Sequence, residues 1–163
     1  MKKAILYRLC GLGAVPKQVR PVLEQEDVFV LDEGMSQWFI TNHVNGPGKR
    51  YRHRSEGFSG YLAVTKERGV CYTYLKRQIS ISIKDSKVTQ LYVEVPKEHR
   101  LFVSFQSSPF LEGWEAVIEF RFDTEKALLF RDALVSIGAQ PGTAPGAHSV
   151  ALPASELSYW ASS

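Results

Sequence analysis

The feature that most constrains the fold of this chain is a series of short strand patterns followed by a single amphipathic helix. The clearest strand pattern is Ile79-Ser80-Ile81-Ser82-Ile83, where apolar and hydroxyl side chains alternate with the two-residue period of a half-buried strand. The helical pattern comes last, at residues 124–137. This order predicts a mainly β fold, a strongly bent antiparallel sheet or partly open barrel closed by one C-terminal α-helix.

Further segments rich in β-branched and aromatic residues predict a total of six to eight strands. The candidates are residues 28–31, 37–43, 60–65, 70–75, 79–83, 88–95, 101–106 and 115–122. In the last segment, Ala116, Ile118, Phe120 and Phe122 share one face of the strand. Gly46-Pro47-Gly48 predicts a sharp turn, and residues 66–69 predict a hairpin loop in which Gly69 has positive φ.

The closing helix carries signals at both of its ends. Asp123 or Thr124 is expected to cap the first turn, and Gly138 stands where a left-handed residue commonly ends a helix. The expected buried stripe, which Leu128 and Leu129 are expected to broaden, consists of Ala127, Phe130, Leu134 and Ile137.

A chain of 163 residues can bury one substantial core, so we expect one domain with flanking extensions. Residues 1–25 are interpreted as an N-terminal extension with a short helix, which Pro16 favours and Pro21 opposes. The barrel domain is predicted at 26–138. Residues 139–163 are rich in Pro, Gly, Ala and Ser without periodicity, and are interpreted as a tail.

Residues 60–68 read Gly-Tyr-Leu-Ala-Val-Thr-Lys-Glu-Arg and precede the alternating strand at 79–83, the segment 88–95 and the final helix. This order resembles the bacterial pleckstrin-homology-like and GRAM-type domains, over residues 26–138. The resemblance implies a bent antiparallel barrel with the helix plugging one open end. It implies no single activity, because this fold serves phosphoinositide binding, peptide binding and self-assembly alike. The chain departs from the family pattern at residues 46–57, where a basic stretch is inserted or elongated.

That basic stretch, Lys49-Arg50-Tyr51-Arg52-His53-Arg54, is the densest run of charge in the chain. In an extended strand Arg50, Arg52 and Arg54 share one face, and guanidinium groups bind phosphate or carboxylate bidentately. We therefore take Lys49, Arg50, Arg52 and Arg54, together with Lys76 and Arg77, as a candidate site for an anion or an acidic partner. The alternative is a solvated edge strand whose charges prevent edge-to-edge aggregation.

Phe110 and Leu111 stand in a polar loop beside Pro109. They form a candidate hydrophobic contact with a partner or a membrane interface. The alternative is that they fold back over the mouth of the barrel.

Catalytic, metal and cofactor motifs are not recognisable in the sequence. The histidines are dispersed, the two cysteines are far apart, and Gly57-Phe58-Ser59-Gly60-Tyr61 lacks the second glycine of a nucleophile elbow. Gly11-Leu12-Gly13 is too short for a phosphate-binding loop. We therefore expect neither an enzyme nor a bound cofactor.

The N-terminal apolar run is short and interrupted by Arg8, so we expect no signal peptide, no transmembrane segment and a cytoplasmic location. A formal net charge of +3 does not by itself indicate a nucleic-acid binder. The leading hypothesis is a non-catalytic interaction or scaffold domain that binds a protein or self-associates. Peripheral binding of an anionic lipid through residues 49–54 is the alternative.

Overall fold

The computed structural model describes residues 7–8, 13–73 and 76–147, and the side chains of 70–79 lie outside that description. The strands are β1 (Val28–Gly46), β2 (Lys49–Thr65), β3 (Arg68–Thr73), β4 (Lys76–Ser82), β5 (Tyr92–Lys97), β6 (Arg100–Gln106), β7 (Glu115–Asp123) and β8 (Gln140–Pro141). The helices are α2 (Arg20–Gln25), the short 3-10 helix η1 (Ser86–Gln90) and α3 (Ala127–Ser136).

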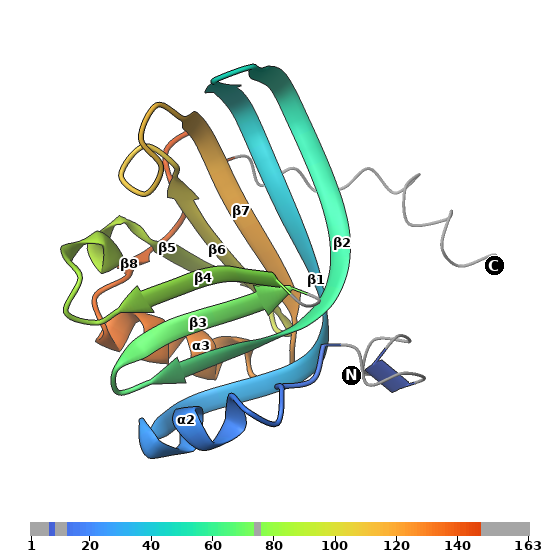
Figure 1. Cartoon of the computed structure of the whole chain (residues 1–163), viewed down its shortest axis with the longest axis vertical. Helices are drawn as coiled ribbons and strands as arrows, with labels where there is room; N and C mark the ends of the chain where they lie inside the picture. Colours follow the sequence, from blue (N-terminus) through green and yellow to red (C-terminus); the bar gives the residue numbers. More distant parts are fainter. Residues whose placement is uncertain (1–6, 9–12, 74–75, 148–163) are drawn as a thin grey trace.

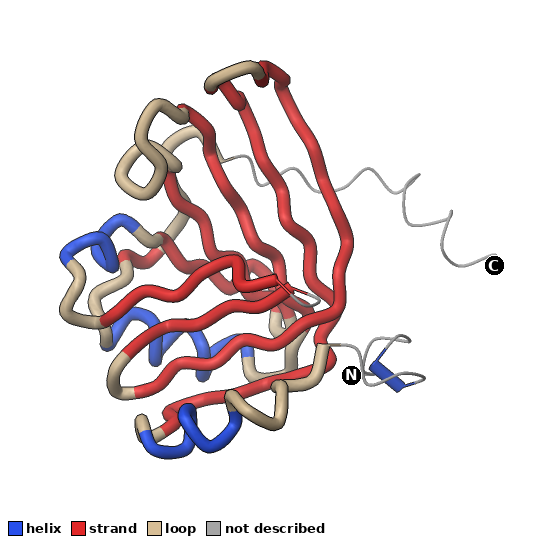
Figure 2. Tube along the Cα trace, in the orientation of Figure 1, coloured by secondary structure: helices blue, strands red, loops and turns tan. Residues whose placement is uncertain are grey.

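These strands form one curled sheet in the order β4-β3-β2-β1-β7-β6-β5-β8. Every neighbouring pair is antiparallel except β5 and β8, which are parallel. Figure 1 shows β1 and β2 bending along their length, so that β3 and β4 curl round toward the side where β5 and β8 lie. Figure 2 shows how strand dominates the molecule, with α3 lying behind β3 in this view. The predicted fold class is confirmed: the sheet is a half-barrel with one C-terminal helix of several turns.

The first two strands are much longer than the sequence indicated, because β1 joins two predicted strands across Glu33-Gly34. The register shifts between Glu33 and Met35, where Gly34 adopts φ +69°. Gly34, which stands between the two predicted strands, is therefore a bulge, and the ladder continues on both sides of it. Pro47 and Gly48 form the predicted turn between β1 and β2.

In the same way β2 runs without a break through Gly57. Gly57 pairs with Trp38 of β1, whose indole Nε1 would lie 3.7 Å from a Cβ at this position. The indole thus covers a residue that has no side chain of its own to pack. This cross-strand contact is invisible to a pattern search along the chain.

Two smaller predictions also need correction. Gly69 does not have positive φ; it lies within β3, and a Cβ there would come within 3.7 Å of Ile81 and Leu134. The predicted strand at 88–95 begins as η1, which Asp85 caps by accepting a 2.9 Å hydrogen bond from Lys87 N, and only from Tyr92 onward is it strand.

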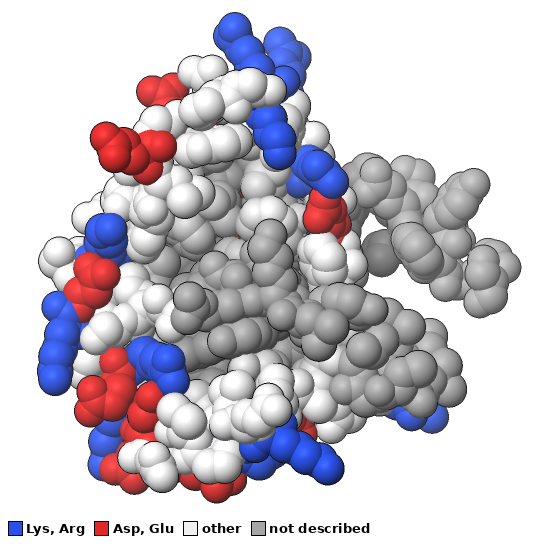
Figure 3. Space-filling model, in the orientation of Figure 1, with Lys and Arg blue, Asp and Glu red and all other residues white. Residues whose placement is uncertain are grey.

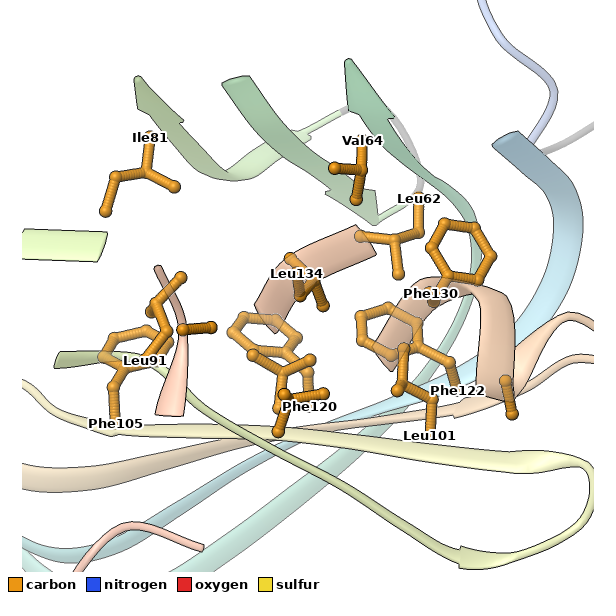
Figure 4. Close-up of a cluster of buried hydrophobic side chains, with 14 of the residues drawn as sticks. Leu62, Val64, Ile81, Leu91, Leu101, Phe105, Phe120, Phe122, Phe130 and Leu134 are labelled. Carbon is orange, nitrogen blue, oxygen red and sulfur yellow. The ribbon is translucent and has the colours of Figure 1, made fainter. Parts of the chain in front are cut away.

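The main core lies on the concave face of the sheet, against α3. Ile118, Phe120 and Phe122 of β7 belong to it, as their alternation predicted. Figure 4 shows side chains from β2 and β4 on one side, and from β6 and β7 on the other, meeting the helix. Those labelled are Leu62, Val64, Ile81, Leu91, Leu101, Phe105, Phe120, Phe122, Phe130 and Leu134.

The helix α3 closes the core with Phe130, which is fully buried. Its C-terminus is as predicted, since Gly138 adopts φ +115° and Ala139 N donates to Leu134 O at 3.0 Å. The expected broadening of the buried stripe is wrong, because Leu128 and Leu129 are 48% and 60% exposed. At 100° per residue both project well away from the stripe that faces the sheet.

Both extensions pack further onto the domain than their composition indicated. The short helix α2 forms with Pro21 in its first turn, and Leu23 packs with Val15 and Tyr61 in a second apolar cluster. At the other end, Gln140 N donates to Leu91 O at 2.7 Å and Ala144 N to Ser104 Oγ at 2.9 Å. Residues 139–147 therefore belong to the domain rather than to a tail. Residues 148–163 lie outside the description.

Candidate functional site: an apolar pocket and a basic sheet edge

A pocket of about 410 Å³ opens at the side where the half-barrel is not closed. Its apolar lining comes from Phe39, Ile81, Leu91, Phe105, Phe110, Leu111, Ile118 and Phe120. Its polar lining comes from Ser80, Asp85 and Lys87. The volume lies within the range of about 300–1,000 Å³ that is usual for ligand sites, and apolar walls with few polar groups are typical of them.

Aromatic rings give the pocket a firm floor. The ring centroids of Phe39 and Phe120 are 5.1 Å apart, and those of Phe105 and Phe110 are 4.9 Å apart with an interplanar angle of 59°. These separations are those of favourable tilted aromatic pairs. Because three of these rings stand on neighbouring strands β1, β7 and β6, the sheet fixes their positions before anything binds.

The loop that follows β6 resolves the two interpretations of Phe110 and Leu111. Phe110 folds back and packs on the core, as one alternative supposed. Leu111, its neighbour, is 50% exposed at the pocket rim. The loop itself is held by Ser107, whose carbonyl accepts from Phe110 N and Leu111 N at 2.9 and 2.8 Å and whose Oγ donates to Trp114 O at 3.0 Å.

Two charged residues of η1 or its cap stand at the polar rim of the pocket. Asp85 is committed to capping η1 through Lys87 N. The ammonium group of Lys87 lies 5.9 Å above the ring of Phe110, in a cation–π contact. The rim thus presents an exposed cation next to an aromatic floor. Sequence reasoning did not identify these residues, since nothing along the chain shows that η1 faces β6 and β7.

The basic stretch lies in the first part of β2, at and beyond the tip of the β1–β2 hairpin. Figure 3 shows blue side chains gathered on this end of the molecule. Among the described residues, no ion pair or hydrogen bond engages the side chains of Lys49, Arg50 or Arg52, all of which are exposed. Arg54 forms an ion pair with Glu56.

This part of β2 is also an open edge of the sheet. On one side β2 pairs with β1 along its length, whereas on the other side β3 pairs only with residues 60–64. From Lys49 to Ser59 no described strand lies beyond β2. The structure therefore places the arginines on an edge strand, as the edge-protection alternative required.

Lys76 and Arg77 lie in β4, and their side chains are outside the described part of the structure. Lys76 pairs with Thr73, which pairs with Gly60 of β2. Gly60 is eight residues beyond Arg52, or roughly 26 Å of strand at 3.3 Å per residue. The backbone therefore does not bring β4 next to the hairpin tip.

A polar network of side chains from β2, β1 and β7 crosses the convex face of the sheet. Asn42 Nδ2 donates to Glu119 Oε1 at 2.8 Å, Arg121 donates to Glu119 Oε2 at 3.3 Å, and His53 Nδ1 lies 2.7 Å from Asn42 Oδ1. Glu119 and Arg121 are both almost fully buried. No local pattern in the sequence points to Glu119 or Arg121. Together with Asn42 and His53 they connect the basic strand to β7 through β1.

The described residues contain no group of three or more His, Cys, Asp or Glu side chains that could hold a metal ion. Within the same residues no helix is long and apolar enough to cross a membrane. No protein-family model matches the chain, and comparison with curated proteins gives no match.

Proposed function

We propose that this protein is a non-catalytic interaction domain that receives an apolar side chain of a protein partner in the pocket. The observation that carries the proposal is the pocket itself, an open apolar site whose rim includes the half-exposed Leu111. Exposed apolar surface of this kind is costly to keep in water unless it is covered by a partner. The resemblance to pleckstrin-homology-like and GRAM-type domains is consistent with this proposal, because those folds serve as binding modules.

The polar groups of the pocket support a binding role. Asp85 already accepts a backbone hydrogen bond, and Lys87 stands over an aromatic ring. A general acid or base has to reach the proton that it transfers, and a nucleophile needs a base beside it. The described lining contains no such pair.

Short capped peptides test the proposal directly. Five-residue peptides of alanine with a central Phe, Trp, Leu or Ala are titrated into the labelled protein, and amide chemical shifts are followed by NMR. We expect the peptides with a large apolar centre to shift the amides of β6, β7 and η1, and the all-alanine peptide to leave them unchanged.

Two matched variants locate the binding. Leu111→Asp places a charge on the rim and should weaken binding at least tenfold. Leu129→Asp makes the same change on α3, at a comparably exposed leucine outside the pocket lining, and should have no effect. Equal loss in both variants, or no shifts with any peptide, contradicts the proposal.

A further inference from the structure

We propose that the free edge of β2, from Lys49 to Phe58, binds an extended acidic segment of a partner protein by strand addition. This surface is separate from the pocket, whose described lining includes no residue of β2. The proposal therefore goes beyond the apolar contact and does not depend on it.

The first argument is the backbone of the edge. In an antiparallel pair only alternate residues direct their N–H and C=O groups to the neighbouring strand, and the others point away from it. Because β1 lies on one side only and the pairing of β2 with β3 begins at Gly60, the outward groups of residues 49–58 have no described strand to bond. Figure 1 shows β2 as the outermost strand along this stretch. An extended chain can complete this ladder, which is the basis of strand-addition binding.

The second argument is charge. Lys49, Arg50 and Arg52 are exposed and have no described carboxylate partner. Side chains directly opposite each other on neighbouring strands lie close enough to interact, and opposite charges stabilise such pairs. A segment with acidic residues therefore fits this edge, and its carboxylates can be bound bidentately by arginine.

The spacing of the arginines predicts the pattern of the segment. Arg50 and Arg52 are two residues apart in one strand, so they project from the same face. The preferred segment therefore has acidic residues at two alternate positions. Farther along, Arg54 is already paired with Glu56. A third carboxylate opposite Glu56 would face a like charge, so the acidic pattern should end there.

The same charges make a second copy of this chain a poor occupant. Two β2 edges paired antiparallel over residues 49–54 would set Lys49 opposite Arg54 at both ends, which is unfavourable. The basic residues thus disfavour this pairing of two copies and favour an acidic strand. This combines the edge-protection interpretation with a selective binding role.

Three six-residue capped peptides test the proposal with the full-length chain. The first alternates Glu and Val, the second alternates Lys and Val, and the third is the Glu-Val peptide with N-methyl groups on alternate residues. Binding is measured by fluorescence anisotropy at 0.05 and 0.5 M salt, and hydrogen exchange of the amides of residues 49–58 is followed. Vesicles with and without anionic phospholipid form a separate arm.

We expect the Glu-Val peptide to bind, to slow amide exchange along residues 49–58 and to lose at least tenfold in affinity at the higher salt concentration. The Lys-Val peptide should not bind. N-methylation should abolish binding, because it removes backbone hydrogen bonds of the ladder but leaves every charge.

Arg50→Ser combined with Arg52→Ser should reduce binding at least tenfold. Lys84→Ser combined with Lys97→Ser removes the same charge from exposed positions elsewhere and should not. Leu111→Asp should also leave this binding intact, which separates it from the pocket.

The proposal is overturned if no acidic peptide binds, or if the N-methylated peptide binds as well as the parent. It is equally overturned if only anionic vesicles bind and the arginine variant loses them, since the surface then recognises a membrane. If the arginine variant aggregates more readily while its peptide binding is unchanged, edge protection alone explains the residues.

Discussion

Replacing Phe130 by Ala should destabilise the fold more than any comparable change on α3. The side chain is fully buried in the main core, between the helix and the two limbs of the half-barrel. Its loss removes the transfer free energy of a benzyl group and leaves a cavity, because the sheet is fixed by its own ladders and cannot collapse onto the gap.

The expected loss is about 3–5 kcal/mol, the range for a large aromatic side chain removed from a packed core. Alanine has the better helix propensity, which offsets at most about 0.7 kcal/mol of this. Leu129→Ala is the matched control on the same helix, since its side chain is 60% exposed and should change stability by no more than about 0.5 kcal/mol.

Urea unfolding followed by circular dichroism measures both variants. With an m-value of about 2 kcal/mol/M, the midpoint of Phe130→Ala should fall by roughly 1.5–2.5 M, while that of Leu129→Ala stays close to the parent. If the two variants unfold at the same urea concentration, α3 does not plug the half-barrel through Phe130 and our account of the core is wrong.

Three further changes test other contacts. Gly138→Ala should lower the free energy of unfolding by about 2 kcal/mol or more, because its φ is +115° and the new Cβ would lie 2.9 Å from Val88. Gly48→Ala, at φ +71° with no neighbour within 4 Å, should lower it less, and thermal unfolding measures both variants. Glu119→Ala should lower the free energy of unfolding by about 3–5 kcal/mol, because it removes the carboxylate that pairs with the buried Arg121, and adding Arg121→Met should recover part of this loss in a double-mutant cycle. A chain that ends after residue 138 should have a lower unfolding midpoint than one that ends after 147, because each lost hydrogen bond of 139–147 contributes about 0.5–1.5 kcal/mol to stability. Equal midpoints would show that this segment does not stabilise the sheet.

The local patterns of the chain determined much of the secondary structure. Alternation in β7 correctly placed Ile118, Phe120 and Phe122 on the core face, and the helical stripe correctly placed Phe130. Gly138 correctly marked the end of α3. These signals work because side chains of a strand or helix return to the same face with a fixed period. The residues that face the core can therefore be predicted without knowing which element packs on them.

Contacts between distant segments were decided only by the tertiary structure. Gly34 stood between two predicted strands, yet it is a bulge within β1, because cross-strand pairing can carry a ladder through a weak position. The indole of Trp38 likewise covers Gly57 within β2. Backbone hydrogen bonds attach residues 139–147, and such bonds leave no signature in side-chain composition.

The two candidate binding surfaces divide along the same line. The sequence identified the arginines and the pair Phe110 and Leu111, since charge runs and apolar residues in polar loops are visible locally. The pocket could not be predicted locally, because it forms only where the curl of the sheet brings η1 and β4 opposite β6 and β7. The free edge could not be predicted either, because it depends on the register in which the pairing of β2 with β3 ends at Gly60. Local periodicity records which side of an element is apolar, but the curvature of the sheet and its pairing limits decide which surfaces stay open.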